Sequence, residues 1–124
     1  MAGGTKARVL VVDDEASIRL LCRINLELDG YEVVEAATID EARAVLAASR
    51  VDVVLLDLHL GTQTTHVLVA ECAIRTPRVP VALLTGSADD RQAREAGADA
   101  VLPKPFDVER LAETVRRLTA PKAR

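Results

Sequence analysis

The sequence predicts an α/β fold in which helices cover both faces of a parallel sheet. Three observations predict it: apolar runs alternate five times with helical patterns, the longest runs are nearly continuous in Val and Leu, and no repeat interrupts the alternation. Continuous apolar runs are typical of strands buried on both faces, as in parallel sheets. The 124 residues are expected to form one domain over 8–119, with short tails at 1–7 and 120–124.

Polar residues stand at the ends of the apolar runs. The third run, Val51-Asp-Val-Val-Leu-Leu-Asp57, ends in a carboxylate. Asp13 and Asp14 follow the first run, Thr85 follows the fourth, and Lys104 comes shortly after the fifth. Because the carboxyl ends of parallel strands meet at one edge, these side chains are expected to lie together. The expected strands are 8–12, 31–35, 51–57, 79–84 and 100–102.

Helix-end signals accompany all five helical patterns; Thr76-Pro77 is expected to end the third helix and Gly97 the fourth. Gly30 is expected to end the first helix. Thr38 and Glu41 fit a capping box, in which the hydroxyl and the carboxylate satisfy amide groups at a helix start. Asp107 is expected to be the N-cap of the last helix. The patterns without a capping residue before them cover 16–29, 66–75 and 89–96, and a polar loop is expected at 58–65.

Each helical pattern has an apolar side that is expected to face the core. Leu20 and Ile24 lie off that side of the first helix. They either widen the core stripe, which is favoured, or form an exposed surface for a partner. Cys22 and Cys72 are expected to be free, buried thiols rather than a disulfide. The expected inward residues are Ile18, Leu21, Cys22, Leu28, Ala42, Val45, Leu46, Leu68, Val69, Cys72, Val108, Leu111, Val115 and Leu118.

Composition excludes several classes of protein. A net charge of −3, from 16 basic and 19 acidic residues, argues against an extended nucleic-acid surface. The basic residues near the end are interpreted as a solvated helix end and tail, with a DNA contact as the alternative; they are Arg116, Arg117, Lys122 and Arg124. The apolar runs are too short to cross a bilayer, and no secretion signal precedes them. A cytoplasmic location is therefore expected.

The three acids at the strand ends have an electrostatic consequence. If the first and third strands are neighbours, Asp13, Asp14 and Asp57 crowd one small volume. Two unit charges about 4 Å apart repel by roughly 4 kcal/mol at an effective dielectric near 20. Lys104 offsets one of three charges, and a divalent cation fits the remainder; Mg²⁺ is favoured, with Mn²⁺ as an alternative. The simpler alternative is that Asp13 and Asp14 cap a helix while Asp57 starts a loop.

In combination, these residues resemble the receiver domain of bacterial two-component response regulators, of the stand-alone, chemotaxis-regulator-like type. The resemblance covers residues 9 to about 118. It implies a flavodoxin-like (βα)5 doubly wound sandwich with a parallel five-stranded sheet in the order 2-1-3-4-5. The motifs that carry it are Val-Val-Asp13-Asp14-Glu, Leu-Leu-Asp57, Leu-Thr85-Gly and Gly97-Ala-Asp-Ala-Val-Leu-Pro-Lys104-Pro-Phe106.

The resemblance assigns roles to the residues at the strand ends. It makes Asp57 the phosphoacceptor, which attacks a phosphohistidine and forms an acyl phosphate. It implies that Asp14 binds Mg²⁺ directly and Asp13 mainly through a water, while Asp57 and the backbone carbonyl of His59 complete the ligands.

The other two strand-end residues would act on the phosphoryl group. By the same resemblance, Lys104 contacts a phosphoryl oxygen, and Thr85 turns its hydroxyl towards the phosphoryl group. The family resemblance also predicts a cis peptide between Lys104 and Pro105.

The implied function is that of a receiver which accepts a phosphoryl group from a sensor histidine kinase or a histidine phosphotransfer protein. It would signal by contact with a downstream protein target or pass the group on in a phosphorelay. Slow self-catalysed loss of the group is implied, without turnover of a small molecule. No nucleic-acid or membrane partner is expected, and the chain is expected to be a monomer or a weak homodimer. The first helix is the implied donor-docking region; the fourth helix, fifth strand and fifth helix form the implied output surface.

Five positions depart from the family pattern. Val101 stands where an aromatic residue usually reports phosphorylation on the surface, so the readout is expected to differ. Gly61 and Thr65 replace the usual Pro and Gly in the loop after the acceptor. His59 either tunes access to the phosphoryl site or is an exposed loop residue, which is the favoured interpretation. His66 is interpreted as packing rather than as a metal ligand.

Three other functions compete with this interpretation. A pseudo-receiver, which acts as a protein interaction module and is never phosphorylated, is the main alternative. A metal-dependent phosphotransferase or hydrolase would need a substrate pocket for which no residues are evident. A flavodoxin-like cofactor binder is disfavoured because an acidic loop repels a phosphate without a metal.

Overall fold

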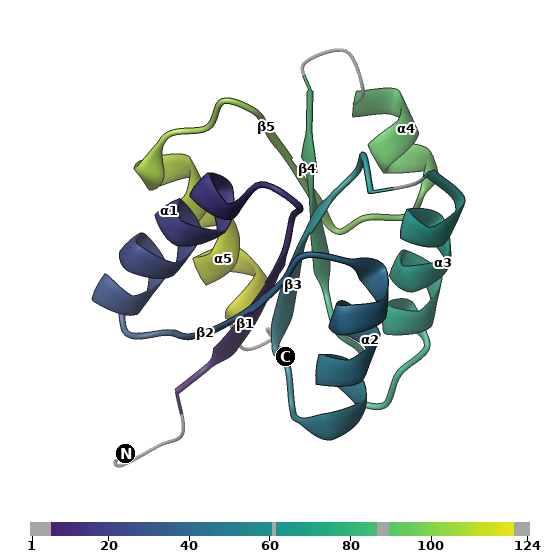
Figure 1. Ribbon diagram of the computed structural model, residues 1–124, viewed down its shortest axis with the longest axis horizontal. Helices are drawn as coiled ribbons and strands as arrows, with labels where there is room; N and C mark the ends of the chain where they lie inside the picture. The colour runs from purple at the N-terminus through teal and green to yellow at the C-terminus, as the bar shows by residue number, and fades with distance from the viewer. Residues whose placement is uncertain (1–5, 61, 87–89, 121–124) are drawn as a thin grey trace.

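A five-stranded parallel sheet in the order β2-β1-β3-β4-β5 organises the molecule, as the sequence predicted. The computed structural model describes residues 6–60, 62–86 and 90–120. Helices α1 and α5 cover one face of the sheet, and α2, α3 and α4 cover the other (Figure 1). The strands are β1 Arg8–Val12, β2 Glu32–Ala36, β3 Val53–Asp57, β4 Val81–Thr85 and β5 Ala100–Pro103; the helices are α1 Ala16–Leu28, α2 Ile39–Ala48, α3 Thr62–Ala73, α4 Asp90–Glu95 and α5 Val108–Thr119.

Two apolar clusters, one on each face, hold the helices to the sheet. Successive strand residues point to opposite faces, so Leu10 and Val12 join the cluster under α2 and α3. Val9 and Val11 join the cluster under α1 and α5. All four side chains are fully buried, which explains why these runs contain no polar residue.

Two strands begin two residues later than predicted. The sequence favoured starts at Val51 and Val79, but pairing starts at Val53 and Val81. Both Val51 and Val79 are buried, so their apolar character reflects packing rather than strand pairing. Strand boundaries defined by hydrogen bonds commonly shift by such an amount.

The predicted start of α3 was wrong. Residues 62–65 were assigned to a polar loop, yet the helix begins at Thr62. Thr65 is fully buried, so one of the polar residues that suggested a loop occupies an inward position. Gly61, which departs from the family pattern in this loop, lies outside the described residues.

The predicted inner side of α1 was partly wrong. Leu28 is 80% exposed, and Leu20 and Ile24 are 53% and 50% exposed, so the favoured core interpretation fails for them. Cys22 is buried as predicted, and Leu26, which was not predicted to face inward, is the other buried residue of this helix. The helix packs on the sheet and on α5, which leaves its other side open. Val108 of α5, also predicted to be inward, is 43% exposed.

The predicted helix ends are confirmed in their main features. Glu41 donates its amide to the Thr38 hydroxyl at 3.1 Å. The Glu41 carboxylate accepts from the Ala37 amide at 2.7 Å, one residue earlier than in a standard capping box. Asp107 accepts from the Arg110 amide at 2.8 Å. Gly30, with φ +93°, adopts the left-handed conformation that favours glycine after a helix.

Both cysteines are free and buried, as predicted. Burial raises the pKa of Cys22 to about 12 and that of Cys72 to about 11. Among the described residues, no helix is long and apolar enough to cross a membrane.

Candidate functional site

The carboxyl edge of the sheet brings the predicted site residues together. Asp57 is the last residue of β3 and Thr85 the last of β4. Asp13 directly follows β1, which pairs with β3 through Val12 and Leu56. Continued in this parallel register, Asp13 lies opposite Asp57, and Thr85 comes one residue after Leu84, the β4 partner of Asp57. The sequence could place these residues at strand ends, and the strand order makes them neighbours.

Three carboxylates share a volume small enough for one metal ion. One oxygen each from Asp13, Asp14 and Asp57 lie within 4.8 Å of one another. Asp13 is fully buried and Asp57 is 4% exposed, whereas Asp14 is exposed. Two close carboxylates held by the fold and one reachable from solvent can receive a hydrated cation.

Backbone amides fix two of these carboxylates. The Glu15 amide donates to Asp13 Oδ1 at 2.9 Å. The His59 amide donates to Asp57 Oδ1 at 3.1 Å, so the backbone of His59 lies beside Asp57. The role of the His59 carbonyl as a ligand remains a prediction.

Lys104 is the cation of this cluster. Its Nζ lies 3.0 Å from Asp13 Oδ2, 3.7 Å from Asp57 Oδ1 and 3.6 Å from a Glu15 oxygen. The Lys104 amide also donates to the Thr85 carbonyl at 2.6 Å, which ties β5 to β4 at this edge. The Lys104–Pro105 peptide is cis, as predicted.

Charge in this cluster is incompletely balanced. Burial raises the pKa of Asp57, and the nearby Asp13 and Asp14 raise it further, against the opposing effects of the His59 amide and Lys104. Burial alone would lower the pKa of Lys104, but its hydrogen bond to Asp13 and the charge of Asp57 raise it. Lys104 therefore stays protonated at neutral pH. One ammonium facing three carboxylates leaves excess negative charge.

A divalent cation fits these residues. Hard cations such as Mg²⁺ prefer oxygen ligands, and carboxylates are the usual protein donors. The raised pKa of Asp57 is the sign that its negative charge lacks full compensation. A cation among the three carboxylates would supply that compensation.

Thr85 contributes a hydroxyl that no protein group satisfies. The side chain is fully buried, and its Oγ1 has no hydrogen-bond partner. An unsatisfied buried hydroxyl costs about 1–3 kcal/mol, so a partner that arrives later would be favourable. The other buried side-chain atoms without a partner in the described part of the chain are Thr65 Oγ1 and His66 Nε2.

Two residues of the surroundings were missed by sequence reasoning. Glu15 lies 3.6 Å from Lys104. Arg19 donates to the Asp13 carbonyl at 2.6 Å and to Glu35 at 3.0 Å. Their position in the first turn after Asp13-Asp14 was the available signal, but charged residues there are common. Only the fold shows that they contact the site.

A cavity of about 450 Å³ lies beside Asp14 and His59. Thr38, Ile39 and Leu60 contribute to its wall. His59 is exposed, which agrees with its favoured interpretation as an exposed loop residue. Val101 is half-buried and packs against the cluster under α2 and α3.

Comparison with known proteins finds one family over most of the chain. A family model described as the response regulator receiver domain matches residues 9–116. Among solved structures, the chemotaxis response regulator CheY4 of Vibrio cholerae is 33% identical, with a TM-score of 0.81, over 92% of this chain and 99% of that one. The receiver domain of NtrX from Brucella abortus is 31% identical, with a TM-score of 0.82, over 90% of this chain and 97% of that one.

The curated relatives are longer proteins. The DNA-binding dual master transcriptional regulator RpaA of Synechocystis is 36% identical over 116 residues, which are 90% of this chain and 48% of RpaA. The phosphate regulon regulatory protein PhoB of Pseudomonas aeruginosa is 38% identical over 119 residues, 88% of this chain and 52% of PhoB. The chain thus spans about half the length of such relatives. Because RpaA binds DNA, the prediction of no nucleic-acid partner is not supported.

Proposed function

The chain belongs to the response regulator receiver domain family, and we propose that it is a working phosphoacceptor whose acceptor is Asp57. The donor is a phosphohistidine of a sensor kinase or of a histidine phosphotransfer protein. The observation that carries this proposal is the convergence of Asp13, Asp14 and Asp57 within 4.8 Å, with Lys104 Nζ 3.7 Å from Asp57. A pseudo-receiver would have no need to hold this unfavourable charge cluster.

In the proposed reaction, an Asp57 oxygen forms a bond to phosphorus while the bond from phosphorus to the donor imidazole breaks. Catalysis of phosphoryl transfer depends on positioning and on charge stabilisation. The His59 amide orients Asp57 through its 3.1 Å hydrogen bond. Lys104 lies close enough to meet a phosphoryl oxygen on Asp57.

Magnesium is the proposed cofactor, with Mn²⁺ as an alternative. Asp13, Asp14 and Asp57 would hold it, together with the His59 carbonyl. Bound there, the ion would neutralise charge on the acceptor and on the incoming phosphoryl oxygens.

Thr85 is the proposed sensor of the phosphoryl group. Its unsatisfied hydroxyl, at the end of the strand next to Asp57, would gain a partner on the phosphoryl group. Movement of Thr85 would then alter the surface formed by α4, β5 and α5. Val101, being small and half-buried, cannot make the large aromatic rotation usual in the family, so this surface would change by backbone movement.

Helix α1 is the proposed docking surface for the donor. Leu20, Ile24 and Leu28 are spaced four apart and are each at least half exposed, so they form one apolar stripe. The helix starts three residues after Asp13. A donor helix packed on this stripe would bring its phosphohistidine close to the acid cluster.

We further propose that the phosphorylated protein signals through protein contacts. It either binds a downstream target or passes the phosphoryl group on in a phosphorelay. Residues 8–119 form the proposed receiver, in the cytoplasm, as a monomer or weak homodimer. The stand-alone arrangement stays a prediction: this chain covers 99% of CheY4 but only about half of RpaA and PhoB.

The test is incubation with Mg²⁺ and a small phosphodonor, followed by intact-mass measurement. We expect the wild type to gain the mass of one phosphoryl group, and Asp57→Asn to gain none. Asp52→Asn is the matched control, because Asp52 lies in the same run at the opposite end of the sheet. EDTA should prevent the adduct. A wild type that stays unmodified, under conditions in which a known receiver is modified, would establish the pseudo-receiver instead.

A further inference from the structure

Three buried polar atoms without a protein partner are found in the described part of the chain: Thr65 Oγ1, His66 Nε2 and Thr85 Oγ1. Thr85 has a role in the proposed function, but Thr65 and His66 do not. Native proteins satisfy nearly all buried polar groups, so each exception calls for an explanation. Thr65 is fully buried, so its hydroxyl cannot reach bulk water.

Sheet geometry puts Thr85 on the face covered by α3. Val81 and Leu83 belong to the cluster under α2 and α3, and Ala82 and Leu84 belong to the other cluster. Because side chains alternate along a strand, Thr85 points to the same face as Leu83. It lies two residues beyond Leu83, roughly 6–7 Å closer to the carboxyl edge.

Helix geometry puts Thr65 at a corresponding height. Helix α3 connects the parallel strands β3 and β4, so it runs back from the carboxyl edge along both (Figure 1). Leu68 and Val69 pack in the same cluster as Leu83. Thr65 precedes them by three and four residues, roughly 5–6 Å closer to the carboxyl edge. We therefore infer that the two hydroxyls lie on the same face of the sheet, each beyond the apolar cluster towards the carboxyl edge.

We propose that Thr65 and Thr85 line a buried polar site that takes water, and that this site holds the Thr85 hydroxyl in its position before phosphoryl transfer. A buried water typically makes about three hydrogen bonds to groups that are otherwise unsatisfied. Thr65 is thus a positioning residue that acts through Thr85. When Thr85 turns towards the phosphoryl group, it must give up this site.

The consequence is that the resting position of Thr85 is stabilised relative to the position in which its hydroxyl contacts the phosphoryl group. A ligand shifts a two-state equilibrium only by its differential affinity for the two states, and a partner for Thr85 in the resting state opposes the phosphoryl group. This inference rests on the proposed function, because it concerns how far the phosphoryl group moves Thr85.

The main experiment measures affinity for beryllofluoride, a phosphoryl mimic, in the presence of Mg²⁺. We expect Thr65→Val to bind the mimic about fivefold more tightly than the wild type, corresponding to one net hydrogen bond. Thr65→Ser keeps the hydroxyl and should bind like the wild type. Thr114→Val is the matched control, because Thr114 is a buried threonine of α5 whose hydroxyl is not among the unsatisfied atoms.

A double-mutant cycle shows whether Thr65 acts through Thr85. In a Thr85→Val background, the effect of Thr65→Val on mimic affinity should vanish. An unchanged affinity for Thr65→Val, or the same gain in both backgrounds, would overturn the inference.

A crystal structure of the wild type gives a readout that needs no phosphorylation. We expect an ordered water within hydrogen-bonding distance of Thr65 Oγ1 and Thr85 Oγ1; a dry region there would also overturn the inference. A wild type that fails to bind beryllofluoride while this water is present contradicts the proposed function and leaves the polar site standing.

Discussion

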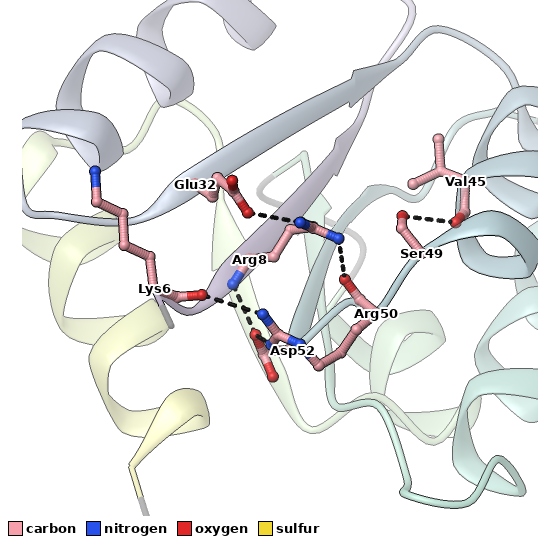
Figure 2. Close-up of polar contacts among 7 residues, drawn as sticks. All are labelled: Lys6, Arg8, Glu32, Val45, Ser49, Arg50 and Asp52. Carbon is pink, nitrogen blue, oxygen red and sulfur yellow. Dashed lines mark hydrogen bonds and ion pairs between the residues drawn. The ribbon is translucent and has the colours of Figure 1, made fainter. Parts of the chain in front are cut away.

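The two edges of the sheet differ in how the charges of their aspartates are compensated. At the amino edge, Asp52 accepts from the Arg8 amide at 2.7 Å and pairs with Arg50 (Figure 2). Asp99 likewise accepts from the Val81 amide at 2.8 Å and pairs with Arg78. Both of these aspartates have a backbone donor and an arginine of their own.

At the carboxyl edge, Asp13 and Asp57 share one lysine, Lys104, and Asp14 has no ion pair among the described contacts. Asp13, Asp14 and Asp57 lie within 4.8 Å of one another, and burial raises the pKa of Asp57. The hydroxyls of Thr65 and Thr85 are also unsatisfied at this edge. This difference separates structural acids from functional ones. The charges of Asp52 and Asp99 at the amino edge are compensated by protein groups, whereas the charges of the acid cluster at the carboxyl edge require a bound cation for compensation.

The largest expected effect on stability tests the amino edge. Asp99→Ala should lower the free energy of unfolding by about 2 kcal/mol, because it leaves the Val81 amide unsatisfied. Val81 is 1% exposed, which limits the replacement of the lost acceptor by water. Urea denaturation measures this loss. Glu113→Ala, at an exposed position of α5, should change stability little; an equal loss in both variants would mean that Asp99 has no special structural role.

A smaller effect of opposite sign is expected at the carboxyl edge. Asp57→Asn should raise the free energy of unfolding by about 1–2 kcal/mol at pH 7 without Mg²⁺, because it removes a poorly compensated buried charge. The pKa of Asp57 is raised above 3.8 in the folded protein, so ionised Asp57 destabilises the fold. This penalty is present above the raised pKa, shrinks as the pH falls towards 3.8, and is absent below it.

Thermal denaturation of Asp57→Asn and wild type across this pH range checks the sign. Added Mg²⁺ should reverse the order at pH 7, because the wild type binds the ion more tightly and is stabilised by mass action. A variant that is less stable than the wild type at pH 7 without Mg²⁺ would remove the contrast between the two edges.

The smallest effect concerns the arginines of the amino edge. Arg50→Gln should cost less than about 1 kcal/mol, because exposed ion pairs are weak. The Arg50 and Asp52 side chains are 46% and 31% exposed, and Asp52 keeps its bond from the Arg8 amide. The loss should shrink further in high salt. Denaturation at low and high salt measures it; a loss as large as that of Asp99→Ala would show that the arginine, not the backbone amide, satisfies the acid.

Most of the fold followed from local patterns. The apolar runs located all five strands to within two residues, and Thr38 and Asp107 cap their helices as predicted. In a strand whose two faces are both covered, every side chain must be apolar, and this does not depend on which helix covers it. A continuous apolar run in the sequence is therefore enough to locate such a strand.

Burial on helices was harder to predict. Leu20, Ile24 and Leu28 were expected in the core and are exposed, because only a partner surface decides whether an apolar helix side is covered. Thr65 failed in the opposite direction: it suggested a loop, yet it is a buried residue of α3. A threonine fits a helix, a loop or a packed position equally well until its neighbours are known.

By itself, the sequence determined the parallel α/β fold and the strand ends at which Asp13, Asp57, Thr85 and Lys104 stand, because these depend on hydrophobic period and on residue order. The tertiary structure alone decided which charges are compensated. Asp52 and Asp57 lie five residues apart in one run, but only Asp52 meets an arginine and a backbone amide across the sheet. Compensation depends on distances between strands that are remote in sequence, and those distances exist only in the folded chain.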